Sequence, residues 1–139
     1  MQCFITALEI WEVNHGREFT VINGKVFSPQ HLAVRCIEWS SQGTEVICGT
    51  SVGCLYVLVV PEMVVRKRVR SHETPIVRIK LSPNNRFLAS GDSSGNVVIY
   101  TWNSCEIYLL IKSVQTLNHC FDWHPWISGC LAISKLGSL

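Results

Sequence analysis

Two short segments of this chain carry a serine in the pattern Gly-x-Ser-x-Gly. Residues 49–53 read Gly-Thr-Ser-Val-Gly, and residues 91–95 read Gly-Asp-Ser-Ser-Gly. In hydrolases this pattern forms a sharp turn between a strand and a helix, where the serine hydroxyl acts as a nucleophile. A nearly continuous apolar run, 96–100, follows the second copy, so we expect a strand and not a helix after its serine. Both copies are better explained as hairpin turns, and we predict no catalytic residue and no enzymatic activity.

A second group of residues has the side-chain types that bind metal ions. His119, Cys120, Asp122 and His124 follow one another closely. Alternation along a strand would place His119 on one face and Cys120 with Asp122 on the other, so one ion could not reach them all. The seven cysteines of the chain include no Cys-x-x-Cys pair, which argues against a zinc site and against a disulfide framework. We therefore expect no metal and no cofactor.

The composition is that of a globular protein without a strong charge bias. Hydrophobic residues make up 47% of the chain, and the formal net charge is +2. This charge is too small to indicate a nucleic-acid partner, and the basic residues between 66 and 70 fit the solvated face of a strand. The longest apolar run, 54–60, is too short to span a bilayer, so we expect no membrane partner. Free cysteines are typical of a reducing compartment, and we expect a cytoplasmic and/or nuclear protein.

The two serine-containing segments belong to a longer repeat with an offset of 42 positions. This offset aligns Ile37 with Ile79, Ser40 with Ser82, Gly49 with Gly91, Ser51 with Ser93, and Gly53 with Gly95. A period of about 40–45 residues with four strands per unit is typical of a blade of a β-propeller. A β-propeller is typically a platform that binds partners, so the repeat favours a binding protein over an enzyme.

Each repeat is predicted to contain four short strands. They cover 35–39, 45–48, 54–58 and 63–69 in the first unit, and 76–81, 87–90, 96–100 and 106–111 in the second. In the strand 76–81 we expect alternation to place Val77, Ile79 and Leu81 on one face. We assign the chain reversal after residue 90 to the glycines of 91–95, because glycine readily adopts positive φ.

Incomplete units are predicted on both sides of these two. The segments 8–13 and 18–22 fit the end of an earlier blade, and 117–123 and 130–134 fit the start of a later one. The predicted boundaries are 1–31, 32–72, 73–115 and 116–139. The predicted fold class is all-β: a partial propeller of about two complete four-stranded blades plus two partial blades. Because a closed propeller needs at least about four blades, we expect the sequence to be a fragment, a truncated isoform or an incomplete gene model, or to associate so that its open strand edges are covered.

The segment from His72 to Trp102 resembles a WD repeat. Ser71-His72 stands where the family has Gly-His, and residues 88–91, Leu-Ala-Ser-Gly, match the family directly. The resemblance implies a WD-repeat propeller.

In that family a histidine, a serine, an aspartate and a tryptophan form a buried hydrogen-bond chain. By this resemblance His72 and Ser90 carry over, and Tyr100 stands at the tryptophan position. Ser94 stands at the aspartate position and has no carboxylate, so we expect a looser blade. The resemblance implies that His72, Ser90 and Tyr100 are structural residues.

The segment from Cys120 to Ala132 is similar to a narrower family. It contains Trp123-His124-Pro125-Trp126, and Trp-x-Pro-Trp is found there in the fizzy and fizzy-related activators of the anaphase-promoting complex, a resemblance that points to the insect cortex branch. The resemblance implies a substrate-recruiting adaptor of that ubiquitin ligase in cell-cycle control and meiosis. Its partners would be the anaphase-promoting complex and proteins with short degron peptides. The alternative is a generic WD-repeat interaction scaffold without a ligase link.

Partner contacts are predicted in the loops that join second to third strands and successive blades, because such loops gather on one face of a propeller. Trp126 is added as an exposed aromatic residue. The candidate contact residues are Ser51, Val52, Arg70, Glu73, Asp92, Ser93, Trp126 and Lys135.

Overall fold

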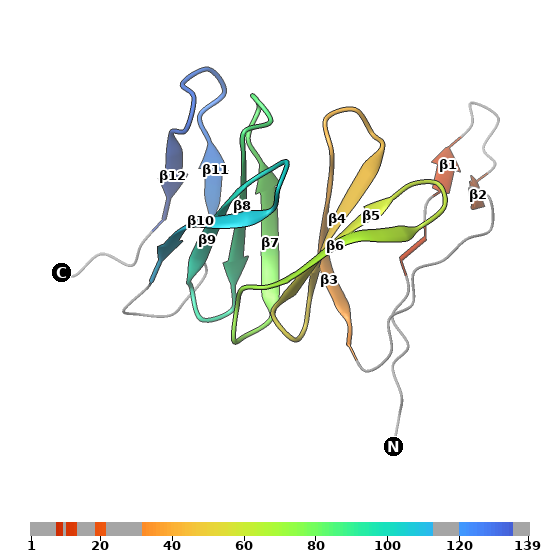
Figure 1. Ribbon diagram of the computed structural model, residues 1–139, viewed down its shortest axis with the longest axis horizontal. Coiled ribbons are helices and arrows are strands. Elements are labelled where there is room, and N and C mark those ends of the chain that lie inside the picture. The colour runs from red at the N-terminus through yellow and green to blue at the C-terminus, as the bar shows by residue number, and fades with distance from the viewer. Residues whose placement is uncertain (1–7, 10, 14–18, 22–31, 113–119, 135–139) are drawn as a thin grey trace.

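The computed structural model describes residues 8–9, 11–13, 19–21, 32–112 and 120–134 (Figure 1). Over these ranges the named elements are all β-strands, and none of the described residues belongs to a helix long and apolar enough to cross a bilayer. The strands form two four-stranded and two two-stranded sheets, all antiparallel. The predicted all-β class, with two complete blades between two partial ones, is confirmed.

The first complete blade has the strand order β3-β4-β5-β6. Its strands are β3 (Val34–Trp39), β4 (Glu45–Thr50), β5 (Cys54–Val59) and β6 (Val64–Arg70). Each strand pairs with its neighbour in sequence, as a series of hairpins requires. The middle strand β5 is nearly continuous in apolar residues because both of its faces are covered.

The second complete blade repeats this pattern. Its strands are β7 (Ile76–Leu81), β8 (Phe87–Asp92), β9 (Val97–Thr101) and β10 (Glu106–Ile111), in the spatial order β10-β9-β8-β7. The two-stranded sheets are β1 (Trp11–Val13) with β2 (Phe19–Val21), and β11 (Phe121–Trp123) with β12 (Leu131–Ile133). In the two complete blades every predicted strand is present, and β8 extends past residue 90 to Asp92.

Among the described residues, the largest of three buried hydrophobic clusters lies between the two complete blades, which stand side by side in Figure 1. Ile47 and Leu55 of the first blade pack with Ile76, Leu88 and Tyr100 of the second, and all five are fully buried. The strand β7 lies against β3 and β4, so that the first strand of one blade covers the inner strands of the blade before it.

Two aligned glycines allow this close packing. A Cβ atom at Gly49 in β4 would lie 2.6 Å from Cγ2 of Ile76 in β7, and one at Gly91 in β8 would lie 2.6 Å from Cε1 of Phe121 in β11. In each blade the glycine therefore gives room to the first strand of the next blade. The prediction that Gly91 helps to reverse the chain is wrong, since Gly91 lies within β8 and the positive φ belongs to Gly95, at 89°.

The predicted alternation in β7 is wrong at its first apolar position. Val77 is exposed, whereas Ile76 and Ile79 are buried. The register against β8 shifts between Ile76 and Arg78. A β-bulge of this kind moves the side chains on its two sides out of phase, which accounts for the exposed valine.

The turns lie at the two opposite ends of the strands (Figure 1). Because neighbouring strands are antiparallel, successive turns alternate between these ends. The end that we call the His72 end carries the connections 51–53, 71–75 and 93–96. The end that we call the Trp126 end carries the connections 40–44, 60–63, 82–86, 102–105 and 124–130.

Candidate functional site

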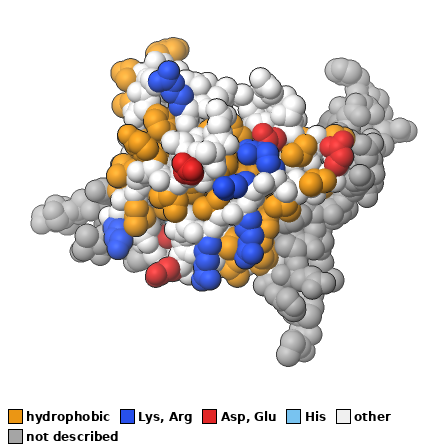
Figure 2. Space-filling view, viewed as in Figure 1, with side chains coloured by type: hydrophobic (Ala, Val, Ile, Leu, Met, Phe, Trp, Pro, Cys, Tyr) orange, Lys and Arg blue, Asp and Glu red, His pale blue; other side chains and the backbone are white. Residues whose placement is uncertain are grey.

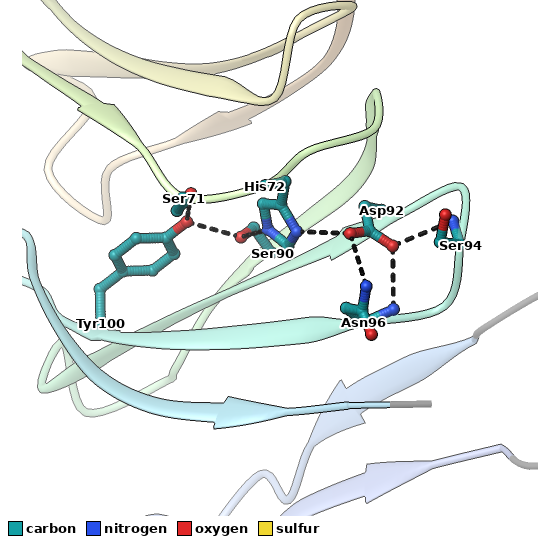
Figure 3. Close-up of polar contacts among 7 residues, drawn as sticks. All are labelled: Ser71, His72, Ser90, Asp92, Ser94, Asn96 and Tyr100. Atoms are coloured by element: carbon teal, nitrogen blue, oxygen red, sulfur yellow. Dashed lines mark hydrogen bonds and ion pairs between the residues drawn. The ribbon is translucent and has the colours of Figure 1, made fainter. Parts of the chain in front are cut away.

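A chain of buried hydrogen bonds crosses the second blade close to the His72 end (Figure 3). The Tyr100 hydroxyl on β9 bonds to Ser71 and, at 2.8 Å, to Ser90 on β8. Ser90 Oγ lies 2.6 Å from Nε2 of His72, and Nδ1 of His72 lies 2.9 Å from Oδ2 of Asp92. The structure thus brings together the three predicted structural residues, His72, Ser90 and Tyr100, and adds Asp92.

The placement of Asp92 among the partner-facing residues is wrong. Its side chain points inward, and only 3% of the residue is exposed. Oδ1 accepts hydrogen bonds from the backbone N–H groups of Ser94, at 3.0 Å, and Asn96, at 2.9 Å, while Oδ2 accepts one from the Asn96 side chain at 3.2 Å. A carboxylate was expected to be missing because Ser94 stands at the family's aspartate position. Asp92, two residues earlier, supplies that carboxylate and completes the chain.

Ser90, His72 and Asp92 have the hydrogen-bond order of a catalytic serine triad. A substrate has no access to this serine, because Ser90 is fully buried and its hydroxyl also bonds to Tyr100. Ser93, the serine of the Gly-x-Ser-x-Gly pattern, is exposed, but β9 follows it instead of a helix. The geometry of this group therefore suits blade packing and not nucleophilic chemistry.

The surroundings of His72 and Asp92 determine their charge states. Burial lowers the pKa of His72, and the hydrogen bond with Asp92 opposes this effect only in part. Burial raises the pKa of Asp92, but the hydrogen bonds from His72 and Asn96 outweigh it and leave that pKa below its usual value. A neutral imidazole fits both contacts, with Nδ1–H donating to Asp92 and Nε2 accepting from the Ser90 hydroxyl.

Acidification is expected to destabilise the fold first through His72. Its pKa in the folded state lies below the ordinary value of 6.5, so the unfolded chain takes up the proton more readily. The contribution of His72 is complete above pH 6.5 and is lost as the pH falls from there towards the lower, folded-state pKa; that of Asp92 is lost below pH 3.8. We predict that the unfolding free energy of His72→Gln, measured with denaturant, varies less with pH below about 6.5 than that of wild type. An unchanged slope in His72→Gln would contradict the assignment.

The first blade has other residue types at the positions that align with this hydrogen-bonded group of the second blade. The 42-residue offset aligns Ser90 with Cys48, Tyr100 with Leu58, and Asp92 with Thr50. Cys48 and Leu58 lie in an apolar cluster, and burial raises the pKa of the Cys48 thiol to about 12. Thr50 Oγ1 donates to the Cys54 carbonyl at 2.8 Å and accepts from the Cys54 N–H at 3.2 Å. In the first blade, Thr50 with its local turn and the apolar residues Cys48 and Leu58 thus replace the hydrogen-bonded side chains of the second blade.

At the opposite end, the loop 124–130 between β11 and β12 presents two large hydrophobic side chains. Trp126 is 89% exposed and Ile127 is 58% exposed. Nδ1 of His124 accepts hydrogen bonds from the backbone N–H groups of Trp126, at 3.1 Å, and Ile127, at 2.9 Å. The His124 N–H donates to the Cys130 carbonyl at 2.7 Å, which closes the loop. The backbone of this turn is therefore ordered by hydrogen bonds, and both side chains are exposed to solvent.

Contacts with the second blade fix the position of this loop. The side-chain amide of Asn84 donates to Ser128 Oγ at 2.5 Å. Nε1 of Trp123 donates to the Lys80 carbonyl at 2.9 Å. A hollow of about 50 Å³ lies between residues 82–84 and 123–129. The Trp126 end thus offers an anchored hydrophobic tip beside a small hollow.

The other predicted contact residues are not beside Trp126. Val52, Arg70, Glu73 and Ser93 are exposed at the His72 end. Ser51 is half-buried there, and its hydroxyl accepts a hydrogen bond from the backbone of the residue that precedes β3, at 2.9 Å.

The His72 end also has a cavity of about 310 Å³, whose lining includes Glu73, Asp92 and Lys112. The predicted contact residue Lys135 lies outside the described residues, as does His119 from the cluster with metal-binding side chains. Among the residues that the structure describes, no three His, Cys, Asp or Glu side chains are grouped so as to hold a metal ion.

Comparisons with known proteins agree with this architecture. Residues 64–101 match the family described as WD domain, G-beta repeat. This match runs from β6 of the first blade through β9 of the second. Protein TEX1 of Saccharomyces cerevisiae is 30% identical over 95 residues, which cover 63% of this chain and 22% of TEX1.

Solved structures show the same fold. The β-propeller domain of Myceliophteria thermophila Cps50 (Swd1) has a TM-score of 0.66 at 18% identity, covering 74% of this chain and 31% of that one. The C-terminal WD40 domain of Sif2 has a TM-score of 0.61 at 17% identity, covering 76% and 31%. Residues 64–101 thus match a WD repeat, the solved structures share the β-propeller fold, and the chain spans less than a third of the length of these relatives.

Proposed function

We propose that this WD-repeat chain is a non-catalytic protein-interaction module whose main contact is the loop 124–130. The observation that carries the proposal is the pair Trp126 and Ile127, whose side chains are exposed on a turn with a hydrogen-bonded backbone. Tryptophan is enriched among the residues that dominate binding energy at protein interfaces. A loop that is already ordered loses little conformational entropy on binding, so more of the contact energy appears as affinity.

The polar group at the other end of the strands supports a scaffold role. The side chains of Ser90, His72 and Asp92 are hydrogen-bonded within the blade and almost fully buried, with His72 and Asp92 at the wall of the cavity at the His72 end. Their polar atoms therefore hold the second blade together and do not offer a reactive group to a ligand.

The finer proposal is that the partner belongs to the anaphase-promoting complex or carries one of its degrons. Its support is the sequence Trp123-His124-Pro125-Trp126, the pattern shared with the fizzy and fizzy-related activators. In this version the chain recruits substrates to a ubiquitin ligase in the cytoplasm or the nucleus. In the broader version the same loop binds a partner without a link to ubiquitination.

Replacing Trp126 with alanine is expected to weaken partner binding by about 30-fold or more, since a central aromatic contact contributes about 2 kcal/mol or more. Stability should change by less than about 0.5 kcal/mol, because the side chain is almost fully solvated. The measurement is quantitative co-purification of proteins with the wild-type chain and with Trp126→Ala, together with thermal unfolding of both.

The control is Val64→Ala, which truncates another exposed hydrophobic residue, 59% exposed, on β6. Partners of the proposed module are retained by wild type and by Val64→Ala but lost by Trp126→Ala. Subunits of the anaphase-promoting complex or degron-bearing proteins among them would support the finer version. Identical partner sets for all three chains would refute the role of the loop.

A further inference from the structure

The outer strands of the two complete blades, β6 and β10, occupy equivalent places in the repeat but differ in the kind of side chain that they expose. Among the described strands, β6 and β10 each have a single hydrogen-bonded neighbour, so each is an edge strand of its sheet. Each also contains a register shift against its neighbour. On β6 the basic residues Arg66, Lys67, Arg68 and Arg70 are all exposed. Charged side chains of this kind protect an open edge from pairing with another chain.

On β10 the charges stand only at the two ends. The strand and its next residue read Glu106-Ile-Tyr-Leu-Leu-Ile-Lys112. Ile107, Tyr108, Leu109 and Leu110 are all exposed, with Tyr108 at 66%. Figure 2 shows the contrast, with hydrophobic side chains gathered over β10 and Lys and Arg side chains over β6. An apolar edge strand of this length invites pairing.

The order of residues in β10 makes a second copy of the same strand a matching partner. Antiparallel pairing about Leu109 would place Glu106 of one chain opposite Lys112 of the other. Ile107 would then face Ile111, and Tyr108 would face Leu110. Both ends would carry an opposite-charge pair and the middle would be apolar. Parallel pairing would instead place Glu106 opposite Glu106 and Lys112 opposite Lys112, and like charges directly opposite each other are destabilising.

We propose that this chain forms a homodimer in which β10 pairs with β10 of a second copy, antiparallel about a two-fold axis at Leu109. Such an interface is isologous, since both chains use the same surface. It would join the two second blades into one eight-stranded sheet, counting the four strands of each. The proposed pairing uses the backbone edge of β10, whereas the proposed partner contact is made by the loop 124–130.

The test is the mass of the 139-residue chain in solution, measured by sedimentation equilibrium over a range of concentrations. Wild type is expected to be a dimer at concentrations where Leu109→Lys is a monomer, because the substitution puts two lysines opposite each other on the axis. The control Val64→Lys places the same charge on the edge strand of the first blade and should leave the dimer intact. Circular dichroism establishes that each variant keeps its β structure.

Charge reversal tests the register. Glu106→Lys alone and Lys112→Glu alone should each weaken the dimer by about tenfold, since each creates two like-charge pairs. The double variant Glu106→Lys with Lys112→Glu restores both pairs and should recover the wild-type dissociation constant. A wild-type chain that remains monomeric, a dimer that Leu109→Lys leaves unchanged, or a double variant no better than the single ones would each overturn the proposal.

Discussion

Replacing Asp92 with alanine should lower the free energy of unfolding by about 3 kcal/mol, the scale for removing one partner of a buried polar pair. The carboxylate accepts hydrogen bonds from His72, from the Ser94 N–H and from both the backbone and the side chain of Asn96. Without it, the buried Nδ1–H of His72 has lost its acceptor, and the turn between β8 and β9 has lost its anchor. Denaturant unfolding at neutral pH measures this loss.

Ser93→Ala is the control for Asp92→Ala. Ser93 lies in the same turn, but its side chain is exposed. We expect its replacement to change stability by less than about 0.5 kcal/mol. If both variants had similar stability, the inward-facing role of Asp92 would be wrong.

Gly53→Ala should cost at least about 3 kcal/mol, through two effects that add. Gly53 has a φ of 76°, and a non-glycine residue in this left-handed region costs about 1–2 kcal/mol. A Cβ atom there would also lie 2.0 Å from the backbone oxygen of His72, which cannot move without shifting the connection between the blades. That connection is held by the Gly53 carbonyl, which accepts hydrogen bonds from the N–H groups of Ser71 and His72, both at 3.2 Å.

Gly43→Ala separates the two effects. Gly43 has a similar φ, 70°, but a Cβ atom there would have no neighbour within 4 Å. Its replacement should therefore cost only the backbone term, about 1–2 kcal/mol. The difference between the two variants measures the close contact between the first blade and the His72 connection. Equal losses of stability in Gly53→Ala and Gly43→Ala would show that this close contact does not contribute to stability.

The repeat was enough to predict the blades, but it could not assign every residue within them. The aligned glycines at 49 and 91 mark equivalent places in β4 and β8. Their role as space for Ile76 and Phe121 depends on how the next blade packs, which periodicity alone does not contain. The exposed Val77 has a similar origin, since a bulge in β7 breaks the strict alternation on which the prediction rested.

The misplacement of Asp92 has a specific cause. The resemblance to WD repeats fixes the carboxylate at the position of Ser94, where this chain has only a hydroxyl. The last residue of β8 can turn its side chain inward and reach the same histidine, and Asp92 does so. Since Asp92 was the only carboxylate in the segment 91–95, its presence was a signal that could have suggested this role.

The position of Trp126 could also have been inferred from strand direction. Its loop follows the first strand of a blade, whereas 51–53 and 93–96 follow second strands. In an antiparallel sheet these two kinds of turn lie at opposite ends. The ordering of the loop by His124 and by the contact between Asn84 and Ser128 could not be predicted, because it depends on side-chain distances between two blades.

Hydrogen exchange of the chain with and without a co-purified partner tests the central claim most directly, because it maps where the partner sits. The account predicts that binding slows exchange of the amides of residues 124–130 and of the neighbouring turn 82–86. It also predicts little change in the turns of the His72 end, 51–53 and 93–96. Protection confined to the His72 end, with unchanged exchange at Trp126 and Ile127, would contradict the account.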